Sequence, residues 1–274
     1  MKNASRLAAA AAALLVTLGA GGVSPAQAQS TTQANQGGAV YIEGSGYCTI
    51  GYNDPARQRS LVAAHCGEEG QRVRLVDHDA RIGSQPVGTF YRSRAYDGRL
   101  GNDWAAIQWD LGVAIGGNSF SGDAWVHPGS LASGQQVCYF GQMSNRPRHD
   151  VTCGSFRGAV GNTFFVDAPM THPGDSGGPI WVPGRGFVGV VSSTWNATPI
   201  PFLGARGFVM GVLPEDGPAV PEASLLALYI QNLLLPAVGS SNGVGADMLR
   251  GAFSHFVSLF SLLGVAIPGA INYT

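Results

Sequence analysis

The stretch Thr171–Ile180, THPGDSGGPI, places one serine, Ser176, among three glycines and two prolines. Glycine permits positive φ angles and a close approach of the main chain to a ligand. One interpretation is that Ser176 is a nucleophile and that the glycines bring backbone N–H groups close to a reacting carbonyl. The other is an ordinary surface loop, because the chain holds 40 glycines in 274 residues.

The composition favours an all-β domain and argues against a nucleic-acid partner. Charged residues make up 12% of the chain and the formal net charge is −1, so there is no basic field to hold a nucleic acid. Low charge, many glycines and frequent Val, Thr and Ser suit short strands joined by tight turns. The length is sufficient for one large domain or two small ones.

The N-terminus has the parts of a secretion signal in the expected order. Two basic residues precede an apolar run, Leu7–Val23, and AQA at residues 26–28 forms a small-x-small cleavage site. We therefore predict a signal peptide over residues 1–28, cleaved after Ala28, and a secreted chain. An uncleaved membrane anchor is the alternative. Residues 29–38 are polar, and we expect them to be disordered.

Four cysteines are compatible with two disulfide bridges, which export permits. Cys48 and Cys66 lie in the first half of the chain, and Cys138 and Cys153 lie in the second. Sequential pairing is the simplest of the three connectivities that four cysteines allow. A zinc site is the competing interpretation, and it is weak because no C-x-x-C pair exists.

Short segments rich in β-branched and aromatic residues recur along the chain, separated by Gly, Pro, Asn or Asp. They divide evenly between two halves, which suggests two similar barrels with one disulfide each. We expect a first barrel over residues 39–122 and a second over 123–235, including a closing helix. The predicted strands are 39–44, 47–52, 60–65, 72–77, 86–92 and 103–109, then 136–142, 150–156, 163–169, 178–183, 187–193 and 208–213.

Beyond Leu213 the pattern changes to helical spacing. Residues 221–234 place Leu and Ile on one helical face, and a second apolar stretch runs over residues 248–267. That stretch contains three serines and a histidine, whereas a transmembrane helix needs ~20 apolar residues. We expect residues 236–274 to form an extension with a helix packed on the barrels. An interfacial or partner-binding helix and a membrane span are the alternatives.

A serine hydroxyl becomes an effective nucleophile when a base takes its proton and a third group orients that base. Among the six histidines, His65 stands out because it ends an apolar strand and precedes Cys66, whose disulfide would fix its backbone. Asp103 lies just before another apolar strand, beside Trp104. A sheltered carboxylate there can accept the proton of the second imidazole nitrogen.

Three motifs occur in the order that chymotrypsin-like serine proteases have: VAAHC at 62–66, NDWA at 102–105 and GDSGGP at 174–179. The chain most resembles the bacterial secreted branch, the streptogrisin and α-lytic group, whose opening strand is similar to GYCTIGY at 46–52. The resemblance covers residues 38–213. It implies two six-stranded antiparallel barrels with the site between them, and a bridge from Cys48 to Cys66.

The resemblance also implies a role for each residue of the motifs. His65 would be the general base and then acid, Asp103 would orient it, and Ser176 would attack the peptide carbonyl. The N–H groups of Gly174 and Ser176 would form the oxyanion hole. The chain would then be a serine endopeptidase that acts as a monomer on protein or peptide substrates and needs no cofactor or metal.

The predicted substrate pocket departs from the family pattern. Met170 stands where bacterial relatives place a cysteine and trypsin-like members an aspartate, so we predict poor cleavage after Lys or Arg. The far wall would be Ser192, Ser193 and Thr194. Thr194 would narrow the pocket, which favours small or medium apolar side chains before the scissile bond. His172 is a further candidate for this pocket, or else an exposed loop histidine.

The partner of Asp175 also departs from the pattern. In the bacterial branch an arginine after the cysteine often pairs with this aspartate, and here that residue is Tyr139. Candidate replacements are Arg146, Arg148 and Arg206, or a hydrogen bond from Tyr139. If none serves, the alternative function is a catalytically weak or inactive protease-like binding protein.

Two other patterns compete with these assignments. The residues 174–178 also match the G-x-S-x-G motif of α/β-hydrolases, but Gly-Gly-Pro is a poor helix start and no alternation of strand and helix precedes it. The cluster Asp77-His78-Asp79 could suggest a metal site. Adjacent side chains of an extended strand cannot converge on one ion, so we interpret the cluster as a polar turn.

Overall fold

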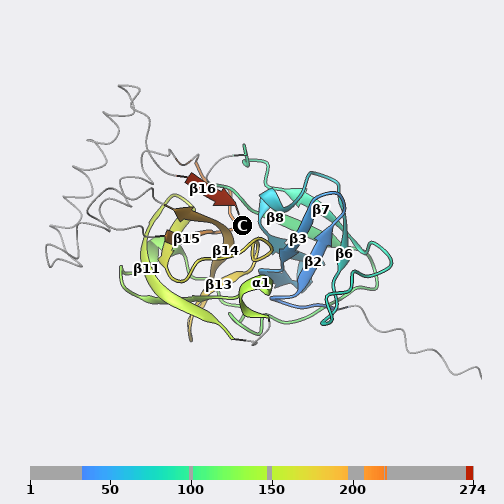
Figure 1. Cartoon of the computed structure of the whole chain (residues 1–274), viewed down its shortest axis with the longest axis horizontal. Helices are drawn as coiled ribbons and strands as arrows, with labels where there is room; N and C mark the ends of the chain where they lie inside the picture. Colours follow the sequence, from blue (N-terminus) through green and yellow to red (C-terminus); the bar gives the residue numbers. More distant parts are fainter. Residues whose placement is uncertain are drawn as a thin grey trace, which may run out of the picture. The chain divides into compact units, whose positions relative to one another are not determined.

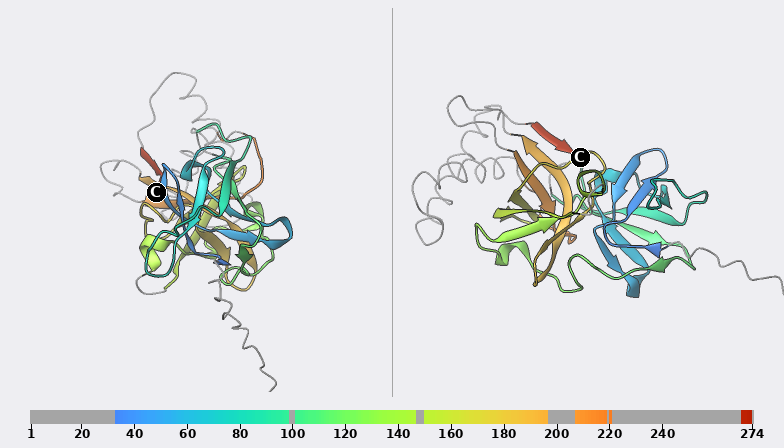
Figure 2. Two further views of the ribbon diagram at one scale, coloured as in Figure 1. Left: turned by 90° about the vertical axis from the view of Figure 1, so that its right-hand side faces the viewer. Right: turned by 60° about the horizontal axis from the view of Figure 1, so that its bottom comes forward.

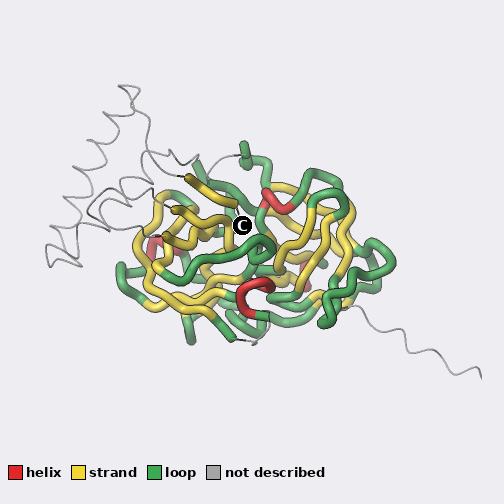
Figure 3. Tube along the Cα trace, viewed as in Figure 1, coloured by secondary structure: helices red, strands yellow, loops and turns green. Residues whose placement is uncertain are grey.

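The computed structural model describes residues 33–98, 101–146, 150–196, 207–218, 220 and 270–273. Within these residues the strands form two seven-stranded sheets and one small two-stranded sheet. Figures 1 and 2 show the two large sheets side by side, and Figure 3 shows that the helical segments are short. They are α1 (Gln142–Asn145) and the 3₁₀ turns η1 (Pro55–Arg57), η2 (Ala64–Cys66) and η3 (Pro128–Ser130).

The first large sheet curves because one bent segment pairs at both of its ends. Its strand order is β3-β2-β6-β7-β8-β5-β4. The end strands β3 and β4 are joined only by Ile50 and Gly51, so a single stretch of chain bonds to β2 and to β5. The strands are β2 (Ala39–Ile42), β3 (Gly46–Thr49), β4 (Tyr52–Asp54), β5 (Arg59–Val62), β6 (Arg72–Leu75), β7 (Gly88–Arg92) and β8 (Ala105–Trp109).

The second large sheet is a closed barrel with one added strand. The order β13-β10-β11-β12-β15-β14 closes through pairing of β13 with β14, and β16 lies outside on β14. The strands are β10 (Gln136–Tyr139), β11 (Thr152–Val160), β12 (Thr163–Asp167), β13 (Pro179–Val182), β14 (Gly186–Asn196), β15 (Gly207–Val212) and β16 (Ala270–Tyr273). The predicted two-barrel fold of the chymotrypsin type is confirmed.

Each barrel has its own apolar core. Alternation along β8 shows how: Ala105, Ile107 and Trp109 point inward while the residues between them are more exposed. Burial of a large aliphatic or aromatic side chain stabilises the fold by about 1.5–3 kcal/mol. The largest buried side chains are Val40, Ile42, Ile50, Phe90 and Ile107 in the first barrel and Tyr139, Phe164, Ile180 and Met210 in the second. Leu61 and Phe187, which are also buried, belong to a cluster shared by the two barrels.

The predicted disorder of residues 29–38 is wrong for the part that the structure describes. Strand β1 (Gln33–Ala34) pairs in parallel with β9 (Ala114–Ile115). Gln36 is buried, and its amide donates to the Gly51 carbonyl at 2.9 Å. A strand of two residues shows no periodicity in the sequence, and a glutamine counts as polar whether it is buried or exposed. Composition therefore could not show that this segment is ordered.

The predicted sequential disulfides are confirmed: Cys48 is bonded to Cys66, and Cys138 to Cys153. The predicted signal peptide and both predicted C-terminal helices lie outside the described residues, and the domain boundaries stay predictions. Residues 270–273, expected within a helical extension, instead form β16. In the described part of the chain no helix is long and apolar enough to cross a membrane.

Candidate active site

The structure brings His65, Asp103 and Ser176 together. The imidazole Nε2 of His65 lies 2.7 Å from the Oγ of Ser176, and its Nδ1 lies 2.7 Å from the Oδ2 of Asp103. His65 belongs to η2, directly after β5, and the bridge from Cys66 to Cys48 ties this turn to β3. The three side chains come from three separate loops, two on the first barrel and one on the second.

Asp103 is fully buried and its carboxylate has a complete set of partners. The backbone N–H of His65 donates to Oδ1 at 2.8 Å, and the hydroxyl of Ser192 donates to Oδ2 at 2.5 Å. Burial acts to raise the pKa of Asp103. The charge and hydrogen bonds of His65 and the bond from Ser192 outweigh burial, so the pKa lies below its ordinary value. The carboxylate is therefore ionised at neutral pH.

Asn102 anchors the backbone that presents Asp103. It adopts a left-handed conformation with φ of 53°, which asparagine tolerates better than most residues. Its Oδ1 accepts from the Gly217 N–H at 2.8 Å and from the Asn162 amide at 2.9 Å. Asn162 lies between β11 and β12, and Gly217 follows β15, so both belong to the second barrel. The Asn102 side chain therefore attaches the Asp103 loop of the first barrel to the second barrel.

The serine loop is held by backbone bonds on both sides. The Gly177 N–H donates to the Val191 carbonyl at 2.7 Å, and the Asp175 N–H donates to the His172 carbonyl at 2.9 Å. Gly174 has φ of +101°, and a Cβ there would meet Cγ of Met143 at 2.7 Å. These constraints explain why the stretch around Ser176 is rich in glycine.

Thr49 of β3 attaches this loop to the first barrel. Its N–H donates to the Ser176 carbonyl at 2.8 Å, and its hydroxyl donates to the Gly174 carbonyl at 2.8 Å. The Thr49 side chain is fully buried. These two bonds hold the peptide groups that directly follow Gly174 and Ser176, and so they tie the serine loop to β3.

The carboxylate of Asp175 is held by donors of the 141–145 turn and of its own loop. Its Oδ1 accepts from the N–H groups of Met143 and Ser144 at 2.8 and 2.9 Å. Its Oδ2 accepts from the His172 N–H at 2.8 Å and from the Ser144 hydroxyl. The Met143 and Ser144 donors belong to the first turn of α1, where backbone N–H groups lack intrahelical partners.

None of the described cations proposed for Asp175 takes this place. Arg146 donates instead to the backbone carbonyls of Asp77, at 3.0 Å, and of His78. The hydroxyl of Tyr139 donates to the Pro169 carbonyl at 2.8 Å, and burial raises the pKa of Tyr139 to about 12. Arg148 and Arg206 lie outside the described residues.

The residues predicted to line the substrate pocket have several different environments. Met170 is 38% exposed, and His172 is exposed with its Nδ1 2.9 Å from the Ser144 hydroxyl. The Ser193 hydroxyl donates to the Met210 sulfur at 3.3 Å. Thr194 is buried, with its hydroxyl 3.4 Å from that of Thr171.

Sequence reasoning placed Ser192 in the substrate pocket, which stays a prediction, and did not anticipate the bond from its hydroxyl to Asp103. It overlooked Thr49 and Ser144 altogether. No local pattern distinguishes these three residues, because each acts through a bond to a residue far away in the chain. Their hydroxyls donate to a carboxylate or a carbonyl, those of Ser192 and Thr49 from buried positions and that of Ser144 from a half-buried one. Only the tertiary contact identifies them.

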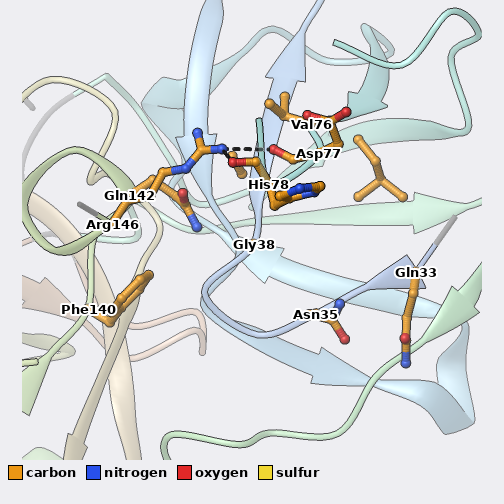
Figure 4. A pocket seen from close by; sticks show the side chains of 11 residues that line it. Gln33, Asn35, Gly38, Val76, Asp77, His78, Phe140, Gln142 and Arg146 are labelled. Carbon is orange, nitrogen blue, oxygen red and sulfur yellow. Dashed lines mark hydrogen bonds between the residues drawn. The ribbon is translucent and has the colours of Figure 1, made fainter. Parts of the chain in front are cut away.

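Two cavities lie near these residues. One of about 330 Å³ adjoins His65 and is lined by Ser45–Cys48, His65, Cys66, Met143, Pro173 and Gly174. A second, of about 550 Å³, lies between Gln33, Gly38, the 75–78 segment, Phe140 and Arg146 (Figure 4). Figure 4 shows the Arg146 guanidinium directed at the Asp77 backbone. The triad does not border this second cavity.

The cluster Asp77-His78-Asp79 forms the predicted polar turn. Oδ1 of Asp77 accepts from the N–H groups of Asp79 and Arg81, both at 2.9 Å. Across the described ranges, no group of three His, Cys, Asp or Glu side chains is placed to hold a metal ion.

The two-barrel fold and the His65–Asp103–Ser176 geometry define the class: a protein of the chymotrypsin-like fold. No family model matches the chain. It is 30% identical over 207 residues to "Uncharacterized protein Rv1815" of Mycobacterium tuberculosis strain ATCC 25618 / H37Rv, covering 71% of this chain and 89% of the relative. "Uncharacterized protein MT1863" of strain CDC 1551 / Oshkosh matches to the same extent. The chain belongs to the family of these mycobacterial proteins.

Two solved structures of kallikrein-related peptidase 10, one in complex with Zn²⁺, are also similar to the chain. Each is 17% identical to it, covering 65% of this chain and 90% of the other, with TM-scores of 0.40 and 0.42.

Proposed function

We propose that the chain is a secreted serine endopeptidase that cleaves peptide bonds through an acyl-enzyme. The observation that carries this proposal is the imidazole of His65, bonded to Ser176 on one nitrogen and to buried Asp103 on the other. A base oriented in this way can take the serine proton and hold the resulting positive charge beside a carboxylate.

The chemistry follows from these contacts. Oγ of Ser176 attacks the substrate carbonyl while Nε2 of His65 takes its proton. The oxyanion accepts hydrogen bonds from the N–H groups of Gly174 and Ser176, and one such donor contributes about 3–4 kcal/mol to transition-state stabilisation. His65 then gives the proton to the leaving amine. A water molecule, deprotonated by the same imidazole, hydrolyses the acyl-enzyme.

The cavity beside His65 fits the leaving side of the substrate. It is bounded by Gly174, by the Cys48–Cys66 bridge and by the imidazole that protonates the amine. We propose that it receives the residue after the scissile bond. Its walls include the exposed side chains of Tyr47 and Met143, so an apolar residue suits this position.

On the acyl side we propose a preference for small or medium apolar residues. Thr194 and Thr171 lie side by side and buried, and Met170 contributes no charge. A peptide panel that varies the residue before the scissile bond tests this preference. Strong preference for arginine contradicts it. The similarity to the streptogrisin and α-lytic branch stays a prediction.

Labelling with a small fluorophosphonate tests the proposed nucleophile. We expect covalent labelling of the purified chain and none of Ser176→Ala, with Ser130→Ala, at an exposed serine of η3, as a matched control that still labels. Peptide hydrolysis should follow the same pattern. Unlabelled wild-type chain that is folded contradicts the proposal and favours the protease-like binding protein.

The proposal places the mature chain outside the cytoplasm. The two disulfides are consistent with an extracellular location, because such bridges persist in oxidising compartments. Mass spectrometry of the exported chain tests the predicted cleavage after Ala28. A mature N-terminus elsewhere contradicts that position.

A further inference from the structure

Strand β14 extends past the strand that closes the barrel. Its pairing with β13 begins at Gly186 and ends at Val190, opposite Pro179. On its other side β14 remains paired with β15 as far as Asn196. The edge of β14 over residues 193–196 therefore lies outside the barrel closure. We call this stretch the β14 edge.

The β14 edge starts beside the proposed nucleophile. Pro179, where β13 leaves β14, follows Ser176 closely in the chain, and Val191 accepts a bond from the Gly177 N–H at 2.7 Å. The next residue, Ser192, donates to Asp103 at 2.5 Å. A peptide whose main chain lies along the β14 edge and runs toward Ser192 therefore approaches Ser176 of the second barrel and Asp103 of the first.

This edge is occupied by a segment of the same chain. Strand β16 pairs with it in antiparallel register, from Asn196 opposite Ala270 to Ser193 opposite Tyr273. The direction of β16 carries the chain toward Ser192. Figure 1 and the right view of Figure 2 show β16 beside the second barrel, next to β14.

A peptide substrate and β16 would need the same backbone groups. An unpaired edge offers a row of N–H and C=O groups, and an extended peptide binds it by adding a strand. An extended peptide that directs a carbonyl to Ser176 would lie along residues 193–196. One edge pairs with one strand at a time, so β16 and such a peptide exclude each other.

We propose that Ala270–Tyr273 is an internal occupant of the peptide-binding edge, which must leave before an extended peptide binds next to Ser176. Its relevance to turnover rests on the proposed protease function, but its occupation of the edge does not. A tethered segment has an effective concentration of up to about 1 mM. A segment whose free peptide binds at about 0.1 mM would thus raise the apparent KM about tenfold.

Removal of the segment tests the effect on turnover. We compare the full chain with a variant lacking residues 270–274, using one extended apolar peptide substrate and a small fluorophosphonate. We expect kcat/KM for the peptide to rise about tenfold, chiefly through KM, while labelling by the small reagent changes little. Labelling with unchanged peptide kinetics overturns the proposal. No labelling of either form instead means that the proposed protease function has failed.

Binding tests the occupation without any catalysis. In the Ser176→Ala background, a fluorescent peptide of sequence GAINYT, residues 269–274, should bind to the chain that lacks 270–274. It should bind at least about tenfold more weakly to the full chain. A peptide of sequence GAPPYT should bind to neither, because proline cannot donate to a ladder. Equal binding of GAINYT to both chains overturns the proposal.

A second variant covers the case in which the truncated chain misfolds. Ile271→Pro/Asn272→Pro in the full chain removes N–H donors from β16 and leaves the length unchanged. Ile271→Val/Asn272→Thr, which suits a strand, is the matched control. We expect the proline variant to behave like the truncated chain and the control like wild type. Wild-type kinetics and binding in the proline variant overturn the proposal.

Discussion

Two buried aspartates flank the serine, one supplied by each barrel, and they are held in different ways. Asp103 and Asp175 are both fully buried. The partners of Asp103 include an imidazole and the hydroxyl of Ser192, which can change roles between donor and acceptor. Three of the four partners of Asp175 are backbone N–H groups, which can only donate.

The difference indicates different tasks for the two carboxylates. A carboxylate beside an imidazole controls which nitrogen carries a proton, which is a chemical task. A carboxylate among fixed N–H groups ties loops together, which is a structural task. Burial of a carboxylate requires such partners, and backbone amides supply them at Asp175, where the sequence pattern suggested a cation.

The largest expected effect comes from Asp103→Asn. The asparagine amide would donate to Nδ1 of His65 and impose the wrong tautomer, so kcat should fall about 10⁴-fold. Stability should change little, because the imidazole and Ser192 can both accept from the new amide. Steady-state kinetics and thermal melting measure the two effects. Asp110→Asn, at the surface ion pair with Arg72, is the control that should retain activity.

Asp175→Asn should show the reverse balance. Its new amide would face either the N–H groups of Met143 and Ser144 or the His172 N–H and the Ser144 hydroxyl. Only the hydroxyl can accept, so at least one backbone donor would lose its acceptor in either orientation. A buried donor left unpaired costs about 1–3 kcal/mol, so we expect a lower melting temperature. Activity should fall about 10–100-fold through a displaced oxyanion loop. A melting temperature equal to that of wild type would contradict the assigned structural task.

Gly174→Ala sharpens the comparison on the loop itself. Alanine at φ of +101° is strained and its Cβ would meet Met143, so the 174 amide should turn away and kcat should fall about 10²-fold. Gly112→Ala is the matched control, since Gly112 has φ of +95° with nothing within 4 Å of its Cβ. The control should be destabilised by the same backbone strain, because its φ is also positive, but it should keep its activity. Equal kcat in both variants would speak against the role of the 174 amide.

The smallest effect concerns acid stability. The pKa of Asp103 is lowered in the fold, so its contribution is fully present above its unfolded pKa of about 3.9 and is lost as pH falls through the folded value. Ser192→Ala removes one of the bonds that lower this pKa, so the acid-side loss should shift to higher pH. Urea unfolding at a series of pH values measures it. An identical pH profile in the variant would exclude a contribution from Ser192.

Local pattern was sufficient for the main strands of the two barrels, the sequential disulfides and the candidate triad, but it missed β1, β9 and β16. Alternation along stretches such as Ala105–Trp109 is a property of neighbouring residues, so it survives without the tertiary structure. His65, Asp103 and Ser176 stand in motifs whose composition is unusual in itself. The structure brings all three within hydrogen-bonding distance, while their catalytic role remains a proposal for experiment.

Only the tertiary structure decided which hydrogen bonds form between distant segments of the chain. The donors to Asp175, the bond from Ser192 to Asp103, and the pairing of β16 with β14 each join residues with no shared local pattern. A hydroxyl or a backbone N–H looks the same in the sequence whether it faces water or a buried carboxylate. Sequence by itself determined which residues could do chemistry, and the packing of the two barrels decided which groups hold them and what lies along the β14 edge.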